Sequence, residues 1–191
     1  MHPKKVRRNA SARAGDVLVL GKPLGVGVYS AALKKEALDA AGYAAMIAST
    51  TQLNTPGPRL ADIDGVHALT DVTGFGLLGH LNEIALGSGL AATLRVRDLP
   101  LLPGVAELAA RGFVTGASGR NWAGYGRHVT LHDIDDTTRA LLTDPQTSGG
   151  LLVACAPEAV DAVLAVFRDE GFANAAVVGT MAEGSGVSVA R

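Results

Sequence analysis

The sequence predicts a globular domain of the α/β or α+β class. Segments typical of strands and of helices alternate along the whole chain. The chain has 191 residues, of which 48% are hydrophobic, and a chain of this length forms an adequate core in one domain. Charged residues make up only 18%, which excludes a disordered polyelectrolyte. Periodicity alone does not order the strands within a sheet.

Seven short segments have the pattern of strands. The first, residues 16–20, is a run of Asp, Val and Leu between Gly15 and Gly21, and such a bounded apolar run is typical of a buried strand. The other expected strands cover residues 65–69, 91–96, 127–130, 151–154, 175–180 and 186–190.

Helices are expected between these strands. A helix over 29–41 would end at Gly42, and a second would cover 43–54. Pro56 is expected in the first turn of a short helix capped by Thr55. Further helices are predicted over 75–86, 104–111, 134–142 and 157–170, the third of them with Asp133, Asp135 and Asp136 near its N-terminus.

Residues 112–126 differ from the segments around them. They hold five glycines and the single tryptophan. Because glycine disfavours helix and strand interiors, we expect a long surface loop here.

Charge and composition exclude several classes of protein. Lys and Arg total 17 against 18 Asp and Glu, a net charge of −1, so the basic excess of a nucleic-acid-binding protein is missing. No apolar run is long enough for a membrane-spanning helix, and the first residues lack the apolar stretch of a signal peptide. We therefore expect a cytoplasmic protein that binds neither nucleic acid nor membrane.

The first fourteen residues form a basic segment. They contain Lys4, Lys5, Arg7, Arg8 and Arg13 and no acidic residue. A block of like charge at a terminus is usually a solvated tail, and that interpretation is favoured. The alternative is a strand or loop edge that faces phosphate.

Asp71 is the first candidate functional residue. It follows an expected strand and precedes a glycine turn and a helix. A carboxylate at a strand exit can bind Mg²⁺, which uses one or two carboxylates together with waters and phosphate oxygens. The competing interpretation is an ordinary helix N-cap, a position that Asp fills well.

Two glycine-rich segments are further candidates. Residues 21–27 lack the Gly-Lys-Ser/Thr ending of a Walker loop. Residues 144–150, Asp-Pro-Gln-Thr-Ser-Gly-Gly, either form a turn that leads into a buried strand or line a substrate site with hydroxyl and backbone N–H groups. The turn is the favoured interpretation.

The cysteine and the histidines suggest no catalytic site. Cys155, the single cysteine, excludes an internal disulfide and lies in an apolar run, so it is expected to be a small buried hydrophobe rather than a nucleophile. The five histidines form no close pair and are expected to be structural or exposed rather than ligands: His2, His67, His80, His128 and His132.

Four segments carry a further signal in their sequence, order and spacing: residues 8–16, 22–27, 69–80 and 144–152. Together they resemble the selenide, water dikinase (selenophosphate synthetase) family. The intact Asp-Pro-Gln-Thr-Ser-Gly-Gly run resembles this family rather than aminoimidazole ribonucleotide synthetase, thiamine monophosphate kinase or the hydrogenase-maturation dehydratase. The segment 55–58, Thr-Pro-Gly-Pro, departs from the family, whose members are usually helical there.

The resemblance implies a fold and a domain organisation. The fold would be α+β, a mixed sheet flanked by helices. Residues 16–191 would be a C-terminal ATP-synthetase-like domain, and residues 1–15 a remnant of the join to an N-terminal domain. That domain carries the family's catalytic Cys or selenocysteine, a Lys, two metal-binding Asp residues and the ATP loop.

The resemblance also implies an activity. The family makes selenophosphate from selenide, ATP and water and releases AMP and phosphate. Asp71 matches the Mg²⁺ ligand that the C-terminal domain supplies, while no catalytic residue and no certain nucleotide-binding residue is expected here. The expected partners are the N-terminal domain and, for the full-length protein, a second copy in a homodimer. Alternatives are a stand-alone, non-catalytic domain that binds a nucleotide or a partner, and another member of the ATP-synthetase superfamily.

Overall fold

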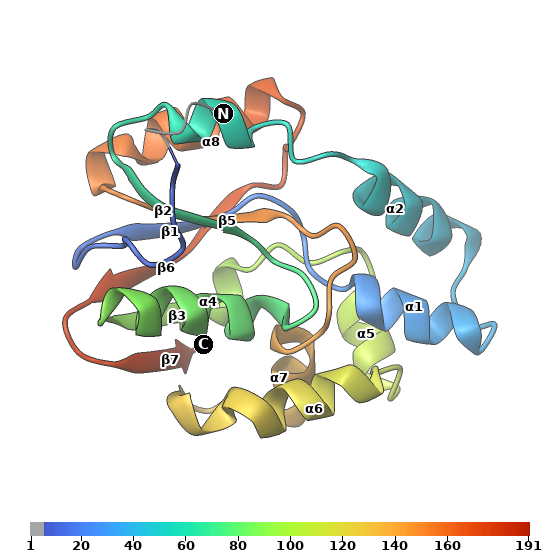
Figure 1. Ribbon diagram of the computed structural model, residues 1–191. Coiled ribbons are helices and arrows are strands. Elements are labelled where there is room, and N and C mark those ends of the chain that lie inside the picture. The colour runs from blue at the N-terminus through green and yellow to red at the C-terminus, as the bar shows by residue number, and fades with distance from the viewer. Residues whose placement is uncertain (1–5) are drawn as a thin grey trace.

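Seven strands form one mixed sheet in the computed structural model, which describes residues 6–191 (Figure 1). The strand order is β2-β5-β1-β6-β3-β7-β4, antiparallel except where β7 pairs with β3 and β4. All seven predicted strands are present, and the α+β class is confirmed. The strands are β1 (Val17–Leu20), β2 (Val66–Asp71), β3 (Ala91–Arg95), β4 (Val129–Leu131), β5 (Leu151–Cys155), β6 (Ala176–Ala182) and β7 (Gly186–Ala190).

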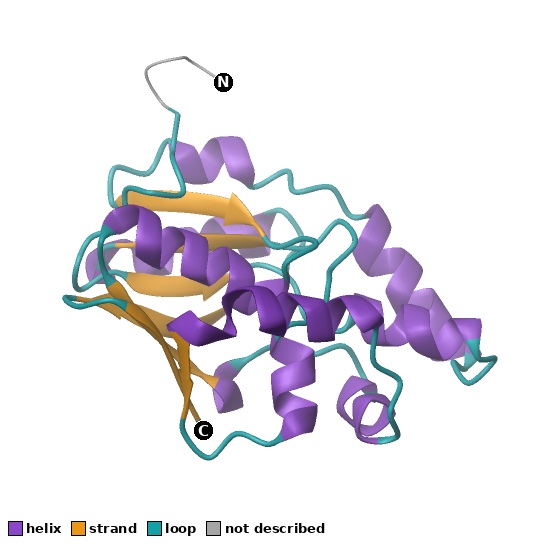
Figure 2. Cartoon of the chain, turned by 60° about the horizontal axis from the view of Figure 1, so that its bottom comes forward, coloured by secondary structure: helices purple, strands orange, loops and turns teal. Residues whose placement is uncertain are grey.

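Helices cover both faces of the sheet and extend beyond one end of it (Figures 1 and 2). α4 packs on one face, and α3 and α8 pack on the other face over β1, β2 and β5. The α-helices are α1 (Val26–Lys34), α2 (Ala40–Thr51), α3 (Gly57–Ala61), α4 (Gly76–Ser88), α5 (Val105–Ala110), α6 (Gly116–Tyr125), α7 (Asp136–Leu142) and α8 (Val160–Asp169). No helix within residues 6–191 combines the length and apolar character needed to cross a membrane.

β5 is buried on both faces. Leu152 and Ala154 belong to the core under α4, whereas Val153 and Cys155 belong to the core under α8. Successive side chains of a strand point to opposite faces, so a strand between two helical layers has an uninterrupted apolar run. Cys155 is fully buried, which confirms its expected burial, and this burial raises the pKa of its thiol to about 12.

A third core holds α1, α2, α5 and α7 together at the end of the sheet. Tyr29 of α1 is fully buried there, and its hydroxyl donates a hydrogen bond to the Pro103 carbonyl. Met46 of α2 and Val105 of α5 complete the contact.

Two helix boundaries differ from the prediction. The expected helix over 29–41 is wrong, because α1 covers Val26–Lys34 and α2 begins at Ala40. Gly42 does not end a helix, since its N–H donates to Asp39 Oδ1 at 2.7 Å and Asp39 is the N-cap of α2. Thr55 does not cap α3, because Pro56 occupies that N-cap position.

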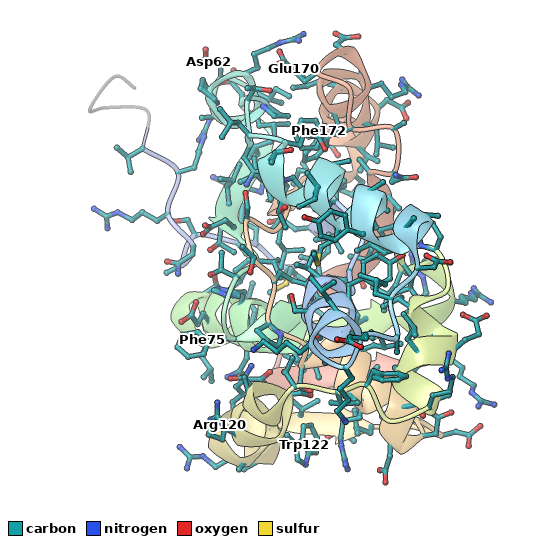
Figure 3. The ribbon with its side chains drawn as sticks, turned by 90° about the vertical axis from the view of Figure 1, so that its right-hand side faces the viewer. Asp62, Phe75, Arg120, Trp122, Glu170 and Phe172 are labelled. Carbon is teal, nitrogen blue, oxygen red and sulfur yellow. The ribbon has the colours of Figure 1, made fainter. Side chains whose placement is uncertain are left out.

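The expected surface loop over 112–126 is also wrong. Residues Gly116–Tyr125 form α6, and the Thr115 side chain accepts a hydrogen bond from Ser118 N–H as its N-cap. The Trp122 ring lies 5.3 Å from the Arg139 guanidinium of α7. These contacts stabilise the helix despite its glycines. Figure 3 shows Arg120 and Trp122 at the end of the molecule opposite Asp62 and Glu170.

Candidate functional site

Asp71 is the last residue of β2 and is exposed. It lines a cavity of about 590 Å³ with Arg7, Arg8, Asn9, Ala10, Asn54, Leu69, Thr70 and Leu151. The N-cap interpretation of Asp71 is wrong, because α4 begins at Gly76 and Phe75 occupies its N-cap position. The carboxylate is therefore not used to cap α4 and faces a cavity with basic and amide side chains.

The strand end that carries Asp71 is held by two glycines. Val72 N–H donates to the Gly150 carbonyl at 2.9 Å, and Asp71 pairs with Leu151 across the ladder. A Cβ on Gly149 would lie 1.9 Å from the Val72 carbonyl oxygen. Only glycine permits this approach, so the backbone after Asp71 is held closely against the start of β5.

Asp144 and Gln146 cap α1 from a distant part of the chain. Asp144 Oδ2 accepts hydrogen bonds from the N–H groups of Gly27 and Val28, at 2.9 and 3.2 Å. Gln146 Oε1 accepts from those of Gly25 and Val26, at 3.1 and 3.2 Å. The first N–H groups of a helix have no partner within the helix, and these two side chains supply the partners. The predicted turn before a buried strand is confirmed.

Asp144 is completely buried at this helix end. Burial raises its pKa to about 7, while the hydrogen bonds from Val28, Gln146 and Gly27 act in the opposite direction. Its second carboxyl oxygen, Oδ1, is buried without a hydrogen-bond partner. Desolvation of this carboxyl group therefore favours its neutral form.

Lys22 connects the two glycine-rich segments, a role that sequence reasoning missed. Its ammonium group donates to the carbonyls of Ser49, Gln52 and Ser148, at 3.0, 2.6 and 2.7 Å. The side chain is buried, and this burial lowers its pKa. Lys22 thus joins the C-terminal end of α2 to the turn before β5. The sequence does contain a signal for this role. A lysine follows closely after a buried strand, and its segment lacks the Ser or Thr of a phosphate loop.

Two asparagines hold the turn before β5 and the segment that follows Asp71, and sequence reasoning missed both. Asn54 Nδ2 donates to the Gly149 carbonyl at 2.9 Å, and its Oδ1 is buried without a partner. Asn121 Nδ2 donates to the carbonyls of Gly74 and Thr143, at 2.9 and 3.0 Å. Asn121 lies in α6, a helix that was not predicted because of the glycines in residues 112–126.

No histidine among residues 6–191 lines the cavity with Asp71. His67 Nδ1 is 2.7 Å from Asp16 Oδ1, and His80 Nε2 is 3.2 Å from Thr73 Oγ1. In the part of the chain that the structure describes, no three His, Cys, Asp or Glu residues form a group that could hold a metal ion. His2 lies outside the described residues.

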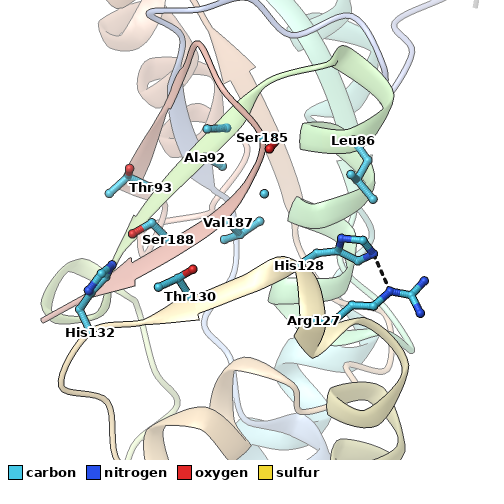
Figure 4. Close-up of a pocket in the computed structure, with 12 residues that line it drawn as sticks. Leu86, Ala92, Thr93, Arg127, His128, Thr130, His132, Ser185, Val187 and Ser188 are labelled. Carbon is cyan, nitrogen blue, oxygen red and sulfur yellow. Dashed lines mark hydrogen bonds between the residues drawn. The ribbon is translucent and has the colours of Figure 1, made fainter.

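A second cavity, of about 470 Å³, lies against β3, β7 and β4 (Figure 4). Thr93, Ser188 and Thr130 form one row across these strands. His128 accepts a hydrogen bond from Arg127 Nε at 2.9 Å, and His132 lies further along the same wall. None of the residues that line this cavity is acidic, so it offers no carboxylate for a hard cation.

The fold and the motif region around Asp71 place the chain in a known class. Residues 13–191 match the model of the AIR synthase related protein, C-terminal domain, so the chain belongs to that family. Among solved structures, E. coli HypE superposes with a TM-score of 0.70 at 26% identity, over 97% of this chain and 49% of HypE. Thiamine-monophosphate kinase from Stenotrophomonas maltophilia K279a gives a TM-score of 0.68 at 22% identity, over 97% of this chain and 53% of the kinase.

Two curated relatives carry the name of the same enzyme. The selenide, water dikinase of Burkholderia pseudomallei (strain K96243) is 68% identical over 97% of this chain and 52% of that protein. The enzyme of the same name from Pseudomonas straminea is 62% identical over 97% of this chain and 52% of its own length. The chain therefore spans about half the length of the curated relatives that it matches.

Proposed function

We propose that this chain is the C-terminal half of a selenide, water dikinase. In that reaction selenide, ATP and water give selenophosphate, AMP and phosphate. The observation that carries the proposal is the 68% identity to a selenide, water dikinase across nearly the whole chain. The exposed carboxylate of Asp71 at the end of β2 agrees with the proposal.

The residues around Asp71 fit a magnesium ion. Carboxylate oxygens are preferred Mg²⁺ ligands, and Mg²⁺ in phosphate-binding sites uses few protein carboxylates. Within residues 6–191, Asp71 forms no ion pair, so its charge is available to a cation. A bound Mg²⁺ would neutralise charge on the ATP phosphates during transfer.

The chain's own residues hold the ligand in place. Gly149 and Gly150 hold the backbone at Val72, directly after Asp71, against the start of β5. Lys22 and Asn54 secure the turn that contains these glycines. The carboxylate is therefore presented from a rigid strand end rather than from a loop.

The remaining parts of the reaction belong to the proposed N-terminal half. The thiol of Cys155 is buried and its pKa is raised to about 12, which makes it unsuitable as the nucleophile. The nucleophile, further metal ligands and the ATP loop would come from the N-terminal half, and the full-length protein would act as a cytoplasmic homodimer. A protein of the same fold, HypE, has been solved in complex with ATP, which supports ATP as the substrate.

The test is Asp71→Asn in the full-length protein. Loss of a metal ligand removes several kcal/mol of charge stabilisation in the transition state, and 1.36 kcal/mol corresponds to tenfold in rate. We expect a folded enzyme with selenide-dependent AMP formation reduced on the order of a hundredfold or more. Asp161→Asn, an exposed position on α8, is the matched control and should keep normal activity. Near-normal turnover of Asp71→Asn at low magnesium would contradict the ligand role.

A further inference from the structure

The basic segment over residues 6–14 is a built part of the fold. Arg7 Nε and Nη2 donate to the carbonyls of Ala61 and Ile63, at 3.0 and 3.1 Å. Leu69 N–H of β2 donates to the Arg8 carbonyl at 3.4 Å. The favoured expectation of a solvated tail is therefore wrong for residues 6–14, because their backbone runs beside the outer edge of β2. Lys4 and Lys5 lie outside the described residues.

α4 and α6 enclose a groove, here called the α4–α6 groove, with a volume of about 290 Å³. Its walls include three residues from the start of α4 and three from α6: Phe75, Gly79, Glu83, Arg120, Gly124 and Tyr125. A Cβ on Gly124 would meet no atom within 4 Å. The α6 wall is therefore open to an approaching surface.

Phe75 lies in this groove as an exposed ring on a fixed backbone. The residue is 54% exposed. The Tyr125 hydroxyl donates to the Phe75 carbonyl at 2.7 Å, and Asn121 Nδ2 donates to the neighbouring Gly74 carbonyl at 2.9 Å. An aromatic side chain presented in this way loses little conformational entropy on contact, and such side chains are typical anchors of protein interfaces.

The most exposed apolar side chains lie close to Asp71 in sequence or around its cavity. Among residues 6–191, the largest exposed fractions of large hydrophobic residues are those of Leu53, Val6 and Phe75, at 73%, 56% and 54%. Leu53 and Val6 each precede a residue that lines the cavity of Asp71, and Phe75 follows shortly after Asp71. Figure 3 shows Phe75 and Arg120 on the same side of the molecule as the basic segment. Apolar surface that gathers in one region is typical of an interface.

We propose that the α4–α6 groove, with Phe75 as its anchor, is the surface on which the N-terminal half of the full-length protein docks. This inference rests on the proposed function for the existence of that half. The curated relatives are about twice as long as this chain, so a part of similar size has to lie against it. That half would join through the basic segment, on the side of Phe75, and it has to reach Asp71 to supply the remaining metal ligands.

The groove also defines the chemistry of the surface that fits it. The rings of Phe75 and Tyr125 suit an apolar side chain of the other half, and Arg120 and Glu83 add one charge of each sign for a polar rim. Asn82 lines the groove too, and its Oδ1 is buried without a hydrogen-bond partner within residues 6–191. Buried polar atoms usually have a partner, so a donor on the docking segment would complete this wall.

Hydroxyl-radical oxidation followed by mass spectrometry measures the exposure of these side chains. Oxidation of Phe75 should be several-fold slower in the full-length protein than in the 191-residue chain. Tyr43 of α2, which is 47% exposed and does not line the groove, is the matched control and should be oxidised at the same rate in both. Equal oxidation of Phe75 in the two proteins would overturn the proposal. Oxidation of Phe75 that slows as the concentration of the 191-residue chain rises would also overturn it, because a second copy would then occupy the groove.

Gly124→Leu tests the groove by filling it. A Cβ at Gly124 or at Gly119 would meet no atom within 4 Å, but of these two only Gly124 lines the groove. Gly119→Leu is therefore the matched control, and circular dichroism of the 191-residue chain checks that both variants fold. In the full-length protein, Gly124→Leu should return the oxidation of Phe75 toward the rate of the 191-residue chain with the same substitution, whereas Gly119→Leu should keep it slow. Slow oxidation of Phe75 in full-length Gly124→Leu would contradict docking in the groove.

This measurement separates the docking surface from the proposed function. Asp71→Asn should leave Phe75 protected, because docking depends on the groove and not on the carboxylate. Normal turnover of Asp71→Asn with a protected Phe75 would contradict the metal ligand but not the docking surface. Reduced turnover of Asp71→Asn, together with an unprotected Phe75 in the full-length wild type, would contradict the docking surface alone.

Discussion

Individual side chains at the ends of helices and strands organise this molecule. Asp144 caps α1, and Lys22 donates hydrogen bonds to three carbonyls in two segments. Among residues 6–191, the hydrogen bonds of these two ionisable side chains go to neutral groups and not to a group of opposite charge. Taking such groups out of water has a free-energy cost, which the hydrogen bonds offset. Asp144 therefore couples the stability of α1 to pH.

The pKa of Asp144 predicts a pH-dependent stability. Its pKa is about 7 in the folded protein against a usual value of 3.8, so between these values the folded state binds more protons than the unfolded state. The free energy of unfolding should therefore fall as pH rises from about 4 to about 7, and the contribution lost is at most about 4 kcal/mol. Urea denaturation at pH 5 and pH 8 measures this fall in the free energy of unfolding.

Asp144→Asn isolates this contribution from other titrating groups. The amide keeps an oxygen acceptor for the α1 N–H groups but does not titrate, so the fall in unfolding free energy between pH 5 and pH 8 should be smaller than in the wild type. Asp161→Asn, on the surface, should keep the wild-type dependence. An identical pH dependence in Asp144→Asn and the wild type would show that Asp144 titrates near its usual value.

At the level of secondary-structure elements, the contact of β2 with β5 matters most for the site. Asp71 pairs with Leu151, and the backbone beyond Asp71 passes over Gly149. The turn before β5 also caps α1 and is held by Asn54 of the segment after α2. One turn thus connects a strand end, a helix start and a helix end, so a change of its backbone should disturb all three.

Gly149→Ala tests this connection. The added Cβ would lie 1.9 Å from the Val72 carbonyl oxygen, a backbone atom that cannot rotate away. We expect a loss of about 1–3 kcal/mol or more in the free energy of unfolding. Gly119→Ala in α6 is the control, because its Cβ would meet no atom within 4 Å and alanine favours a helix over glycine. Equal stabilities of the two variants in urea denaturation would contradict the close contact.

The whole molecule has a hydrophobic core, but it holds only some of the residues that the proposed reaction requires. Three hydrophobic clusters fill both faces of the sheet and the helical end. The curated relatives are about twice as long, and the described residues contain no group of three metal-binding side chains. Folding and catalysis should therefore be separable.

The 191-residue chain should fold cooperatively without catalysing the reaction. Circular dichroism during urea denaturation checks the first expectation, and selenide-dependent AMP formation checks the second. A full-length relative, assayed at the same concentration, is the positive control. Clear turnover by the chain alone would show that the other half is not needed for catalysis.

Local patterns in the sequence were sufficient for most of the fold and for the position of Asp71. All seven strands and the apolar spacing of α4 follow from neighbours two to four residues apart. The strand exit at Asp71 and the turn over 144–150 follow from the same local signals. The start of α1 does not follow from local signals, because its capping side chains lie 116 to 121 residues away in sequence. α6 and the basic segment 6–14 were likewise misjudged, since α6 packs on α7 and the Arg8 carbonyl accepts a hydrogen bond from Leu69 N–H of β2. Such partners become neighbours only when the chain folds, and their contacts then outweigh the local preferences of glycine and of like charges.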